Sequence, residues 1–347
     1  MMHTIPHHVN SEATPDILTN SYKYGASVLA SDRHFRTERP LKTYLFGHPI
    51  SHSLAPLLHQ TLYDQHSVRW SFTLQDSLEI NNFLPLLHSP HCIGSAVTMP
   101  HKVAFMPHVD ALTEEATTIG AMNTIFIRLD PKTQRRKYIG TNTDCYGIRE
   151  AFRHSNPLLE RAAAGRKAAI IGGGGACRAA VYALGKWFGV SEIFLINRDA
   201  AEVAAVTNSF AEKKFPTRLT YVSSLAQARE LETPVMIVGC VPDHPPATEA
   251  EREAREIVKE FLGRTEKGVV LEMCYHPEPR TEFFELSERA GWKVLPGTEM
   301  MIHQGVAQQV LWTERQDMGA LENTVDVVRR EVDRRVARAK LDRPVAV

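Results

Sequence analysis

The chain has 347 residues, of which 43% are hydrophobic and 23% are charged, and 40 Lys and Arg residues balance 40 Asp and Glu residues. This length predicts two domains, because single domains commonly contain about 100 to 200 residues. Zero net charge argues against nucleic acid or an anionic membrane as a partner, and no apolar run reaches the roughly 18 residues that cross a bilayer. We therefore expect a folded cytoplasmic protein that acts on a small molecule.

The first 40 residues are polar, are interrupted by prolines and show no sustained apolar period. Such a segment buries too little apolar surface to fold alone, so residues 1–40 are expected to form a mobile extension. Three histidines lie near its start, but a short polar tail gives metal ligands no rigid geometry. The five cysteines are scattered without close pairs, which predicts free thiols, and no metal site is expected.

From Lys42 onward, short runs rich in β-forming residues alternate with amphipathic helical patterns up to about residue 150. This alternation is typical of βαβ units. We therefore predict an α/β domain over residues 41–150.

A turn-rich stretch, SNPLLERAAAGRK, separates this domain from a second alternating series that begins KAAIIG. The second series predicts a doubly wound Rossmann domain over residues 151–298. Two more helical patterns come after it, at Met300–Arg315 and Thr324–Lys340. We expect these C-terminal helices, within residues 299–347, to return to the first domain, with the last one as a surface or dimer helix.

The string GGGGA directly follows the apolar strand KAAII and directly precedes a helix. Glycines at such a turn allow the backbone to approach a pyrophosphate, which the free N–H groups and the helix dipole favour. Gly172 and Gly174 fit the first two glycines of the dinucleotide fingerprint, whereas Cys177 replaces the third. The residues expected to bind a dinucleotide are Gly172, Gly173, Gly174, Gly175 and Ala176 here, and Asn197, Arg198 and Asp199 after the next strand.

Arg198 and Asp199 favour different cofactors. Arg198 could stack on an adenine or hold a 2′-phosphate, whereas Asp199 could accept a hydrogen bond from a free 2′-hydroxyl. Asp199 could also simply cap the next helix. The cofactor is therefore NAD or NADP, with the balance toward NAD.

Polar residues occur at expected strand ends in three strings, GHPISHSLAP (47–56), VTMPHK (97–102) and IGTNTD (139–144). Together with IGAMNT (119–124) and HQG (303–305), these strings resemble the shikimate dehydrogenase family in order and spacing over about residues 41–315. The glycine-rich turn followed by an Arg, and the later Asn-Arg pair, are also similar to that family. The resemblance implies a nicotinamide-dependent oxidoreductase that interconverts shikimate and 3-dehydroshikimate, or quinate and 3-dehydroquinate.

Removal of a hydride from an alcohol requires a group that takes the alcohol proton, and a lysine beside a carboxylate can supply it. The resemblance assigns this role to Lys102 and Asp144. It also implies that the ring hydroxyls or carboxylate are bound by Ser53, Thr98, Asn123, Tyr275 and Gln304. A purely structural role remains open for each: Ser53 could cap a helix, and Asn123 could stabilise a turn.

Two positions depart from the family pattern, because Ala55 and Ala96 stand where the family usually has hydrogen-bonding side chains. A divergent dehydrogenase for a related cyclic polyol or amino-substituted ring acid is therefore one alternative, and a non-catalytic sensor of a ring acid or nucleotide is another. The detached chain with an N-terminal extension resembles fungal quinate-utilising enzymes, which favours quinate. Monomer and homodimer both remain open.

Overall fold

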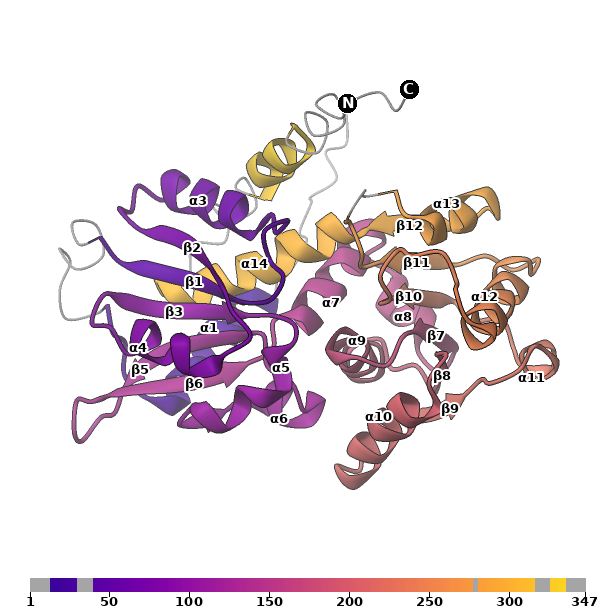
Figure 1. Cartoon of the computed structure of the whole chain (residues 1–347), viewed down its shortest axis with the longest axis horizontal. Helices are drawn as coiled ribbons and strands as arrows, with labels where there is room; N and C mark the ends of the chain where they lie inside the picture. The colour runs from indigo at the N-terminus through magenta and orange to yellow at the C-terminus, as the bar shows by residue number, and fades with distance from the viewer. Residues whose placement is uncertain (1–12, 30–39, 277–279, 316–324, 335–347) are drawn as a thin grey trace, which may run out of the picture.

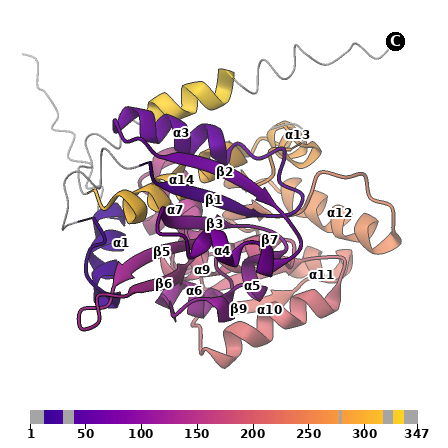
Figure 2. The same ribbon diagram turned by 60° about the vertical axis from the view of Figure 1, so that its left-hand side comes forward.

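The structure is a computed structural model that describes residues 13–29, 40–276, 280–315 and 325–334. Two lobes, each built on a six-stranded sheet, lie side by side, and two helices run between them (Figures 1 and 2). Within the described residues, no helix combines the length and the apolar character needed to span a bilayer.

The first lobe contains a mixed sheet with the strand order β2-β1-β3-β5-β6-β4. β1 runs parallel to β2 and β3, whereas β5 is antiparallel to β3 and β6. Every residue of β3 is buried, as expected for a central strand covered on both faces. The elements are β1 (Lys42–Gly47), α3 (Ala55–Gln65), β2 (Ser71–Asp76), α4 (Leu84–Leu87), β3 (Cys92–Val97), α5 (His101–Ala104), β4 (Ala111–Leu112), α6 (Glu114–Ile119), β5 (Thr124–Leu129) and β6 (Arg136–Thr141).

The second lobe contains a fully parallel sheet with the order β12-β11-β10-β7-β8-β9. The strand order reverses between β7 and β10, which places a crevice at the carboxyl ends of these two strands. The elements are β7 (Lys167–Ile171), α9 (Gly175–Lys186), β8 (Glu192–Ile196), α10 (Ala200–Glu212), β9 (Arg218–Tyr221), α11 (Leu225–Glu230), β10 (Met236–Gly239), α12 (Glu249–Leu262), β11 (Val269–Glu272), α13 (Glu282–Arg289) and β12 (Lys293–Pro296). This doubly wound sheet beside an α/β lobe confirms the predicted fold class.

Helices α7 (Asp144–Ser155) and α14 (Gly297–Thr313) connect the lobes, and the short α8 (Leu159–Ala163) comes after α7. α14 starts directly after the last strand of the second sheet and runs back along the first lobe, as expected (Figure 1). Two glycines allow α14 to pack closely against α7 and α3. A Cβ added to Gly147 of α7 would lie 2.5 Å from the carbonyl oxygen of Met300, and a Cβ added to Gly305 of α14 would lie 2.5 Å from Cδ2 of Leu58. The chain thus passes twice between the lobes, and both passages border the cleft.

The prediction that residues 1–40 form a mobile extension is wrong for residues 13–29. Helix α1 (Ala13–Ser21) and the 3-10 turn η1 (Tyr22–Tyr24) pack beside α14, and Leu18 is fully buried (Figure 2). Ala26 then pairs with Leu129 through two backbone hydrogen bonds at the end of β5. Residues 13–29 contain too few apolar residues to show a helical period in the sequence. The surface that buries them belongs to α14, which is far away along the chain.

The rest of that extension, residues 1–12 and 30–39, lies outside the described residues. The last predicted helix is described only over residues 325–334, which are helical, and Val328 and Val332 within it are buried against the main core.

Candidate active site

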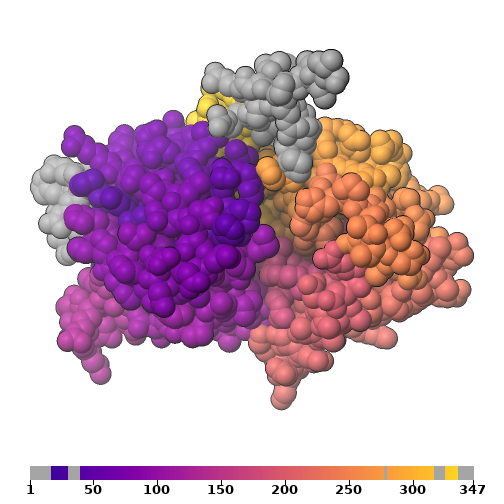
Figure 3. Space-filling model, in the orientation of Figure 1, coloured from indigo at the N-terminus to yellow at the C-terminus, as the bar shows by residue number. Residues whose placement is uncertain are grey.

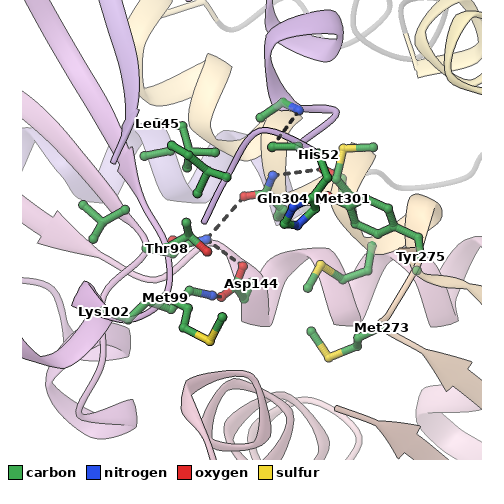
Figure 4. Close-up of a pocket in the computed structure, with 18 of the residues that line it drawn as sticks. Leu45, His52, Thr98, Met99, Lys102, Asp144, Met273, Tyr275, Met301 and Gln304 are labelled. Atoms are coloured by element: carbon green, nitrogen blue, oxygen red, sulfur yellow. Dashed lines mark hydrogen bonds and ion pairs between the residues drawn. The ribbon is translucent and has the colours of Figure 1, made fainter. Parts of the chain in front are cut away.

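A cavity of about 200 Å³ lies between the lobes, where the space-filling view shows a hollow (Figure 3). Its walls come from the carboxyl ends of β1 and β3, from the ends of α7 and α14 that face the cleft, and from the loop after β11. All seven residues predicted to act on or bind the substrate line it: Ser53, Thr98, Lys102, Asn123, Asp144, Tyr275 and Gln304. Figure 4 shows Thr98, Lys102, Asp144, Tyr275 and Gln304 around this cavity. Segments far apart in the sequence therefore converge on one site.

Lys102 and Asp144 form an ion pair in this cavity, with 2.6 Å between Nζ and Oδ2. The second oxygen of Asp144 accepts a hydrogen bond of 2.7 Å from Nδ2 of Asn123. The Asp144 side chain is only 7% exposed and that of Lys102 only 19%, so water competes weakly with the pair. The backbone carbonyl of Lys102 also accepts from the N–H of Met122, which ties α5 to the residues before β5.

Asn123 is the centre of a buried network at the base of the cavity. Its Oδ1 accepts from the backbone N–H of Thr143 and from the hydroxyl of Thr124, both at 2.7 Å. Its Nδ2 lies 3.3 Å from Oε1 of Gln304, which belongs to α14. Asn123 therefore stabilises the turn that carries Asp144 and also presents an amide to the cavity, so both roles considered for it are compatible.

Ser53 and Tyr275 meet across the cleft from opposite lobes. Oγ of Ser53 accepts from the backbone N–H of Ala55 at 3.2 Å and so supports the start of α3. Burial raises the pKa of Tyr275, and hydrogen bonds with the backbone of Leu54 and the side chain of Ser53 oppose that rise. The loop after β11 thus contacts the first lobe beside the cavity.

A second contact across the cleft joins the rings of His52 and His276, which stack with centroids 4.2 Å apart. His52 lines the cavity, and burial together with the neighbouring His276 lowers its pKa. Motif reading did not select either histidine. The apolar part of the cavity includes Ala55 and Ala96, the two positions that depart from the family pattern, along with several methionines.

The glycine-rich turn between β7 and α9 has the geometry of a phosphate-binding loop. Gly172 has φ 127°, a conformation that side chains disfavour. At Gly174, the N-cap of α9, an added Cβ would meet no atom within 4 Å, so this backbone is open to a ligand. A Cβ on Gly175 would lie 3.4 Å from Cδ of Lys102, which places the turn beside the ion pair. The turn therefore fits a pyrophosphate next to the cavity.

The three residues after β8 have different partners. Asn197 donates to Glu202 at 2.7 Å, and Asp199 caps α10 by accepting from the N–H groups of Ala201 and Glu202. The guanidinium of Arg198 forms an ion pair with Glu251 at the start of α12. The capping role considered for Asp199 is thus present, and one oxygen suffices for it, because both N–H groups donate to Oδ1.

Comparison with known proteins identifies the chain's family. Residues 45–125 match the family described as "Shikimate dehydrogenase substrate binding domain". The chain is 46% identical over 297 residues to a quinate dehydrogenase of Emericella nidulans, with 80% of this chain and 89% of that protein covered. The chain belongs to the shikimate/quinate dehydrogenase family. It is therefore a dehydrogenase, as its motifs predicted.

Solved structures of related dehydrogenases have the same fold. The dehydroquinate dehydratase and shikimate dehydrogenase from S. pombe AroM superposes with a TM-score of 0.69 at 28% identity, over 85% of this chain and 53% of that one. Quinate dehydrogenase from Corynebacterium glutamicum in complex with NAD superposes with a TM-score of 0.66 at 23% identity, over 82% of this chain and 98% of that one. At the second identity the likeness is one of fold alone.

Glu272 is a buried acid of this dehydrogenase that the motifs did not reveal. It ends β11, is 1% exposed, and accepts a hydrogen bond of 2.7 Å from the backbone N–H of Cys274. Burial raises its pKa to about 8, and the nearby Asp243 adds to the rise. A carboxyl group at the end of a parallel strand has no sequence signal of burial, because its neighbours come from other strands.

Replacing Glu272 with Gln should stabilise the protein more at pH 8 than at pH 5. The folded state keeps the Glu272 proton up to about pH 8, whereas the unfolded chain releases it near pH 4.5, so the free energy of unfolding falls as pH rises between these values. The slope is at most about 1.4 kcal/mol per pH unit. Urea unfolding at several pH values would measure it, with the exposed Glu266→Gln as control. Equal effects of both variants at all pH values would contradict the prediction.

Proposed function

We propose that this dehydrogenase interconverts quinate and 3-dehydroquinate, or shikimate and 3-dehydroshikimate, by hydride transfer, with quinate as the favoured substrate. The Lys102–Asp144 ion pair at the base of the cleft carries the proposal, because it joins a proton-transferring group to a buried carboxylate where a secondary alcohol would bind. The 46% identity to a quinate dehydrogenase over most of both chains supports quinate.

The chain's own residues handle the proton in this proposal. A bound nicotinamide supplies the acceptor or donor for the hydride. As the alcohol becomes a ketone, Lys102 in its neutral amine form takes the hydroxyl proton, becomes the ammonium that pairs with Asp144, and later releases the proton to solvent. In the reverse direction, the Lys102 ammonium donates its proton to the forming alkoxide. Asp144 orients Lys102 and offsets its charge, while Asn123 holds Asp144 through the opposite oxygen.

The remaining polar lining would hold the ring. We assign the hydroxyls and carboxylate of the substrate to Ser53, Thr98, Asn123, Tyr275 and Gln304, since polar partners are what a hydroxylated acid requires. Ala55 and Ala96 offer the ring no hydrogen bonds. A buried polar group of the ring that is left without a partner costs roughly 1 to 3 kcal/mol. This observation favours a second candidate, a dehydrogenase for a related ring with fewer or differently placed hydroxyls.

For the cofactor we propose a nicotinamide dinucleotide held by Gly172–Ala176 at the pyrophosphate and by Asn197–Asp199 at the adenosine ribose. The open backbone at Gly174 and the N-terminus of α9 support the first assignment. Asp199 retains an oxygen that does not cap α10, and this oxygen could accept from a 2′-hydroxyl. NAD is therefore proposed over NADP.

Replacing Gly174 with Ala should weaken cofactor binding by about tenfold or more while leaving the fold intact, since a loss of about 1.4 kcal/mol has that effect. The added methyl meets no protein atom and the backbone at φ −83° accepts alanine, but the methyl occupies the space where the pyrophosphate would approach. Fluorescence titration with NADH would measure the change. A variant that binds NADH as the wild type does would place the dinucleotide elsewhere.

Initial rates with quinate and with shikimate, each with NAD and with NADP, test the proposed function directly. Turnover of quinate with NAD is the expected result. Turnover of only a less hydroxylated or amino-substituted ring acid would favour the second candidate. A folded protein that binds a ring acid but turns over none of these substrates would favour a non-catalytic sensor.

A further inference from the structure

We propose that Glu251 is a second determinant of cofactor choice, acting together with Asp199. By binding Arg198, Glu251 keeps the guanidinium from serving as a ligand for a 2′-phosphate and adds a fixed negative charge beside it. Dinucleotides with a free 2′-hydroxyl are then preferred. The inference rests on the proposed dinucleotide site and names a residue outside the glycine-rich turn and the strand end that define that site.

The geometry holds Glu251 against Arg198 from a different element. Arg198 follows β8, whereas Glu251 is the third residue of α12, and Oε1 of Glu251 pairs with Nη1 of Arg198. The other oxygen, Oε2, accepts from the backbone N–H groups of Ala247 and Thr248, both at 2.8 Å. With Thr248 these bonds form the capping box that begins α12. The carboxylate is therefore fixed by backbone, and the guanidinium is held to it.

The charge at this position disfavours a phosphate. Hydrogen bonds from the α12 start and from Arg198 lower the pKa of Glu251 to about 2, so the group is ionised throughout the physiological range. Asp199, the next residue along the chain, caps α10 with a carboxylate, and Glu202 accepts from Asn197 at the same strand end. A 2′-phosphate approaching Arg198 would meet the Glu251 carboxylate and a guanidinium that is already paired with it. Like charges set against the disfavoured ligand are a common source of discrimination.

A competing explanation is that the pair is an ordinary surface salt bridge, because the Arg198 side chain is 62% exposed. Such pairs stabilise proteins little and leave ligand choice unchanged. The two explanations predict different cofactor preferences for a variant in which Glu251 loses its charge but keeps its hydrogen bonds. Glu249, in the same helical turn, pairs with Arg252 and offers a matched control.

The decisive variant is Glu251→Gln, because glutamine can also complete a capping box and so preserves the start of α12. Calorimetry would measure the affinity of the wild type and variant for adenosine 2′,5′-bisphosphate and for ADP, which require no ring acid and no turnover. The kcat/KM ratio of NADP to NAD would be measured in parallel.

We expect Glu251→Gln to shift both ratios toward the 2′-phosphate by about tenfold, since relief of a single like-charge contact has effects of this order. Glu249→Gln should shift neither ratio. In an Arg198→Ala background, Glu251→Gln should have a smaller effect, because the released guanidinium is then absent.

Several outcomes would overturn the inference. Ratios that stay within about twofold of wild type in Glu251→Gln would reduce the ion pair to a surface contact while leaving the proposed dehydrogenase function intact. A wild type that already prefers the 2′-phosphate ligands would have the same meaning. Binding of neither adenosine ligand, together with absence of turnover, would instead remove the dinucleotide site and with it both proposals.

Discussion

Replacing Lys102 with Ala should lower kcat by about 10²- to 10⁴-fold, the usual contribution of a positioned acid–base group. Lys102 pairs with Asp144 at 2.6 Å inside the cavity, and under the proposed function the variant leaves the reacting oxygen without a proton carrier. Cofactor affinity should change much less, because the alanine only enlarges the space beside Gly175. Steady-state rates measured with quinate varied at saturating NAD, and with NAD varied at saturating quinate, would separate kcat from KM.

Controls for this prediction distinguish chemistry from folding. The exposed Lys132→Ala variant should keep both wild-type kcat and the wild-type thermal midpoint, and Lys102→Ala, although it deprives Asp144 of its cation, should remain folded at the assay temperature. Asp144→Asn should also lower kcat, since it removes the charge that orients Lys102 but keeps the shape of the side chain. Full turnover by Lys102→Ala would assign the proton transfer to another group and would leave Lys102 a role in packing.

Most of the polar residues that line the cavity could be predicted because they belong to short motifs near the ends of strands or helices. Parallel strands bring their carboxyl ends to one edge of a sheet, so Thr98 after β3 and Ser53 after β1 are expected to lie near each other. Gln304 is 181 residues from Asn123 and yet contacts it, and only the family motif HQG connected the two. The alternation of strands and helices alone would have left Gln304 unplaced.

Features that depend on distant partners could not be predicted in this way. Residues 13–29 have too few apolar side chains for a helical period, and their burial depends on α14 and on the end of β5. Glu251 belongs to the capping box of α12, but its pairing with Arg198 spans 53 residues and joins two parts of the sheet lobe, which no local pattern indicates. Glu272 looks like any strand-end carboxylate until the neighbouring strands enclose it. Ion pairing and burial at such positions depend on tertiary contacts, and the local sequence pattern does not indicate these contacts.

The buried pair of Arg128 and Glu314 holds the N-terminal segment in place. Arg128 lies in β5 and Glu314 directly follows α14; the two side chains are 1% and 2% exposed, with 3.3 Å between Nη1 and Oε1. Arg128 also donates to Oγ of Ser21, while Glu314 accepts from the N–H of Val28 and the hydroxyl of Ser27. One ion pair therefore joins the first sheet, the end of α14 and the segment that was expected to be mobile.

Replacing Arg128 with Met should lower the free energy of unfolding by about 3 to 5 kcal/mol, because the buried Glu314 carboxylate would lose its ion pair with Arg128. The control is Arg166→Met: Arg166 and Glu266 have the same 3.3 Å separation but side chains that are 49% and 72% exposed, so the loss should be below about 1 kcal/mol. Denaturant unfolding would measure both. Adding Glu314→Gln to Arg128→Met should recover part of the loss, since the double variant removes both charges of the buried pair. Equal losses in Arg128→Met and Arg166→Met would mean that apolar contacts such as Leu18, rather than the ion pair, hold residues 13–29 against α14.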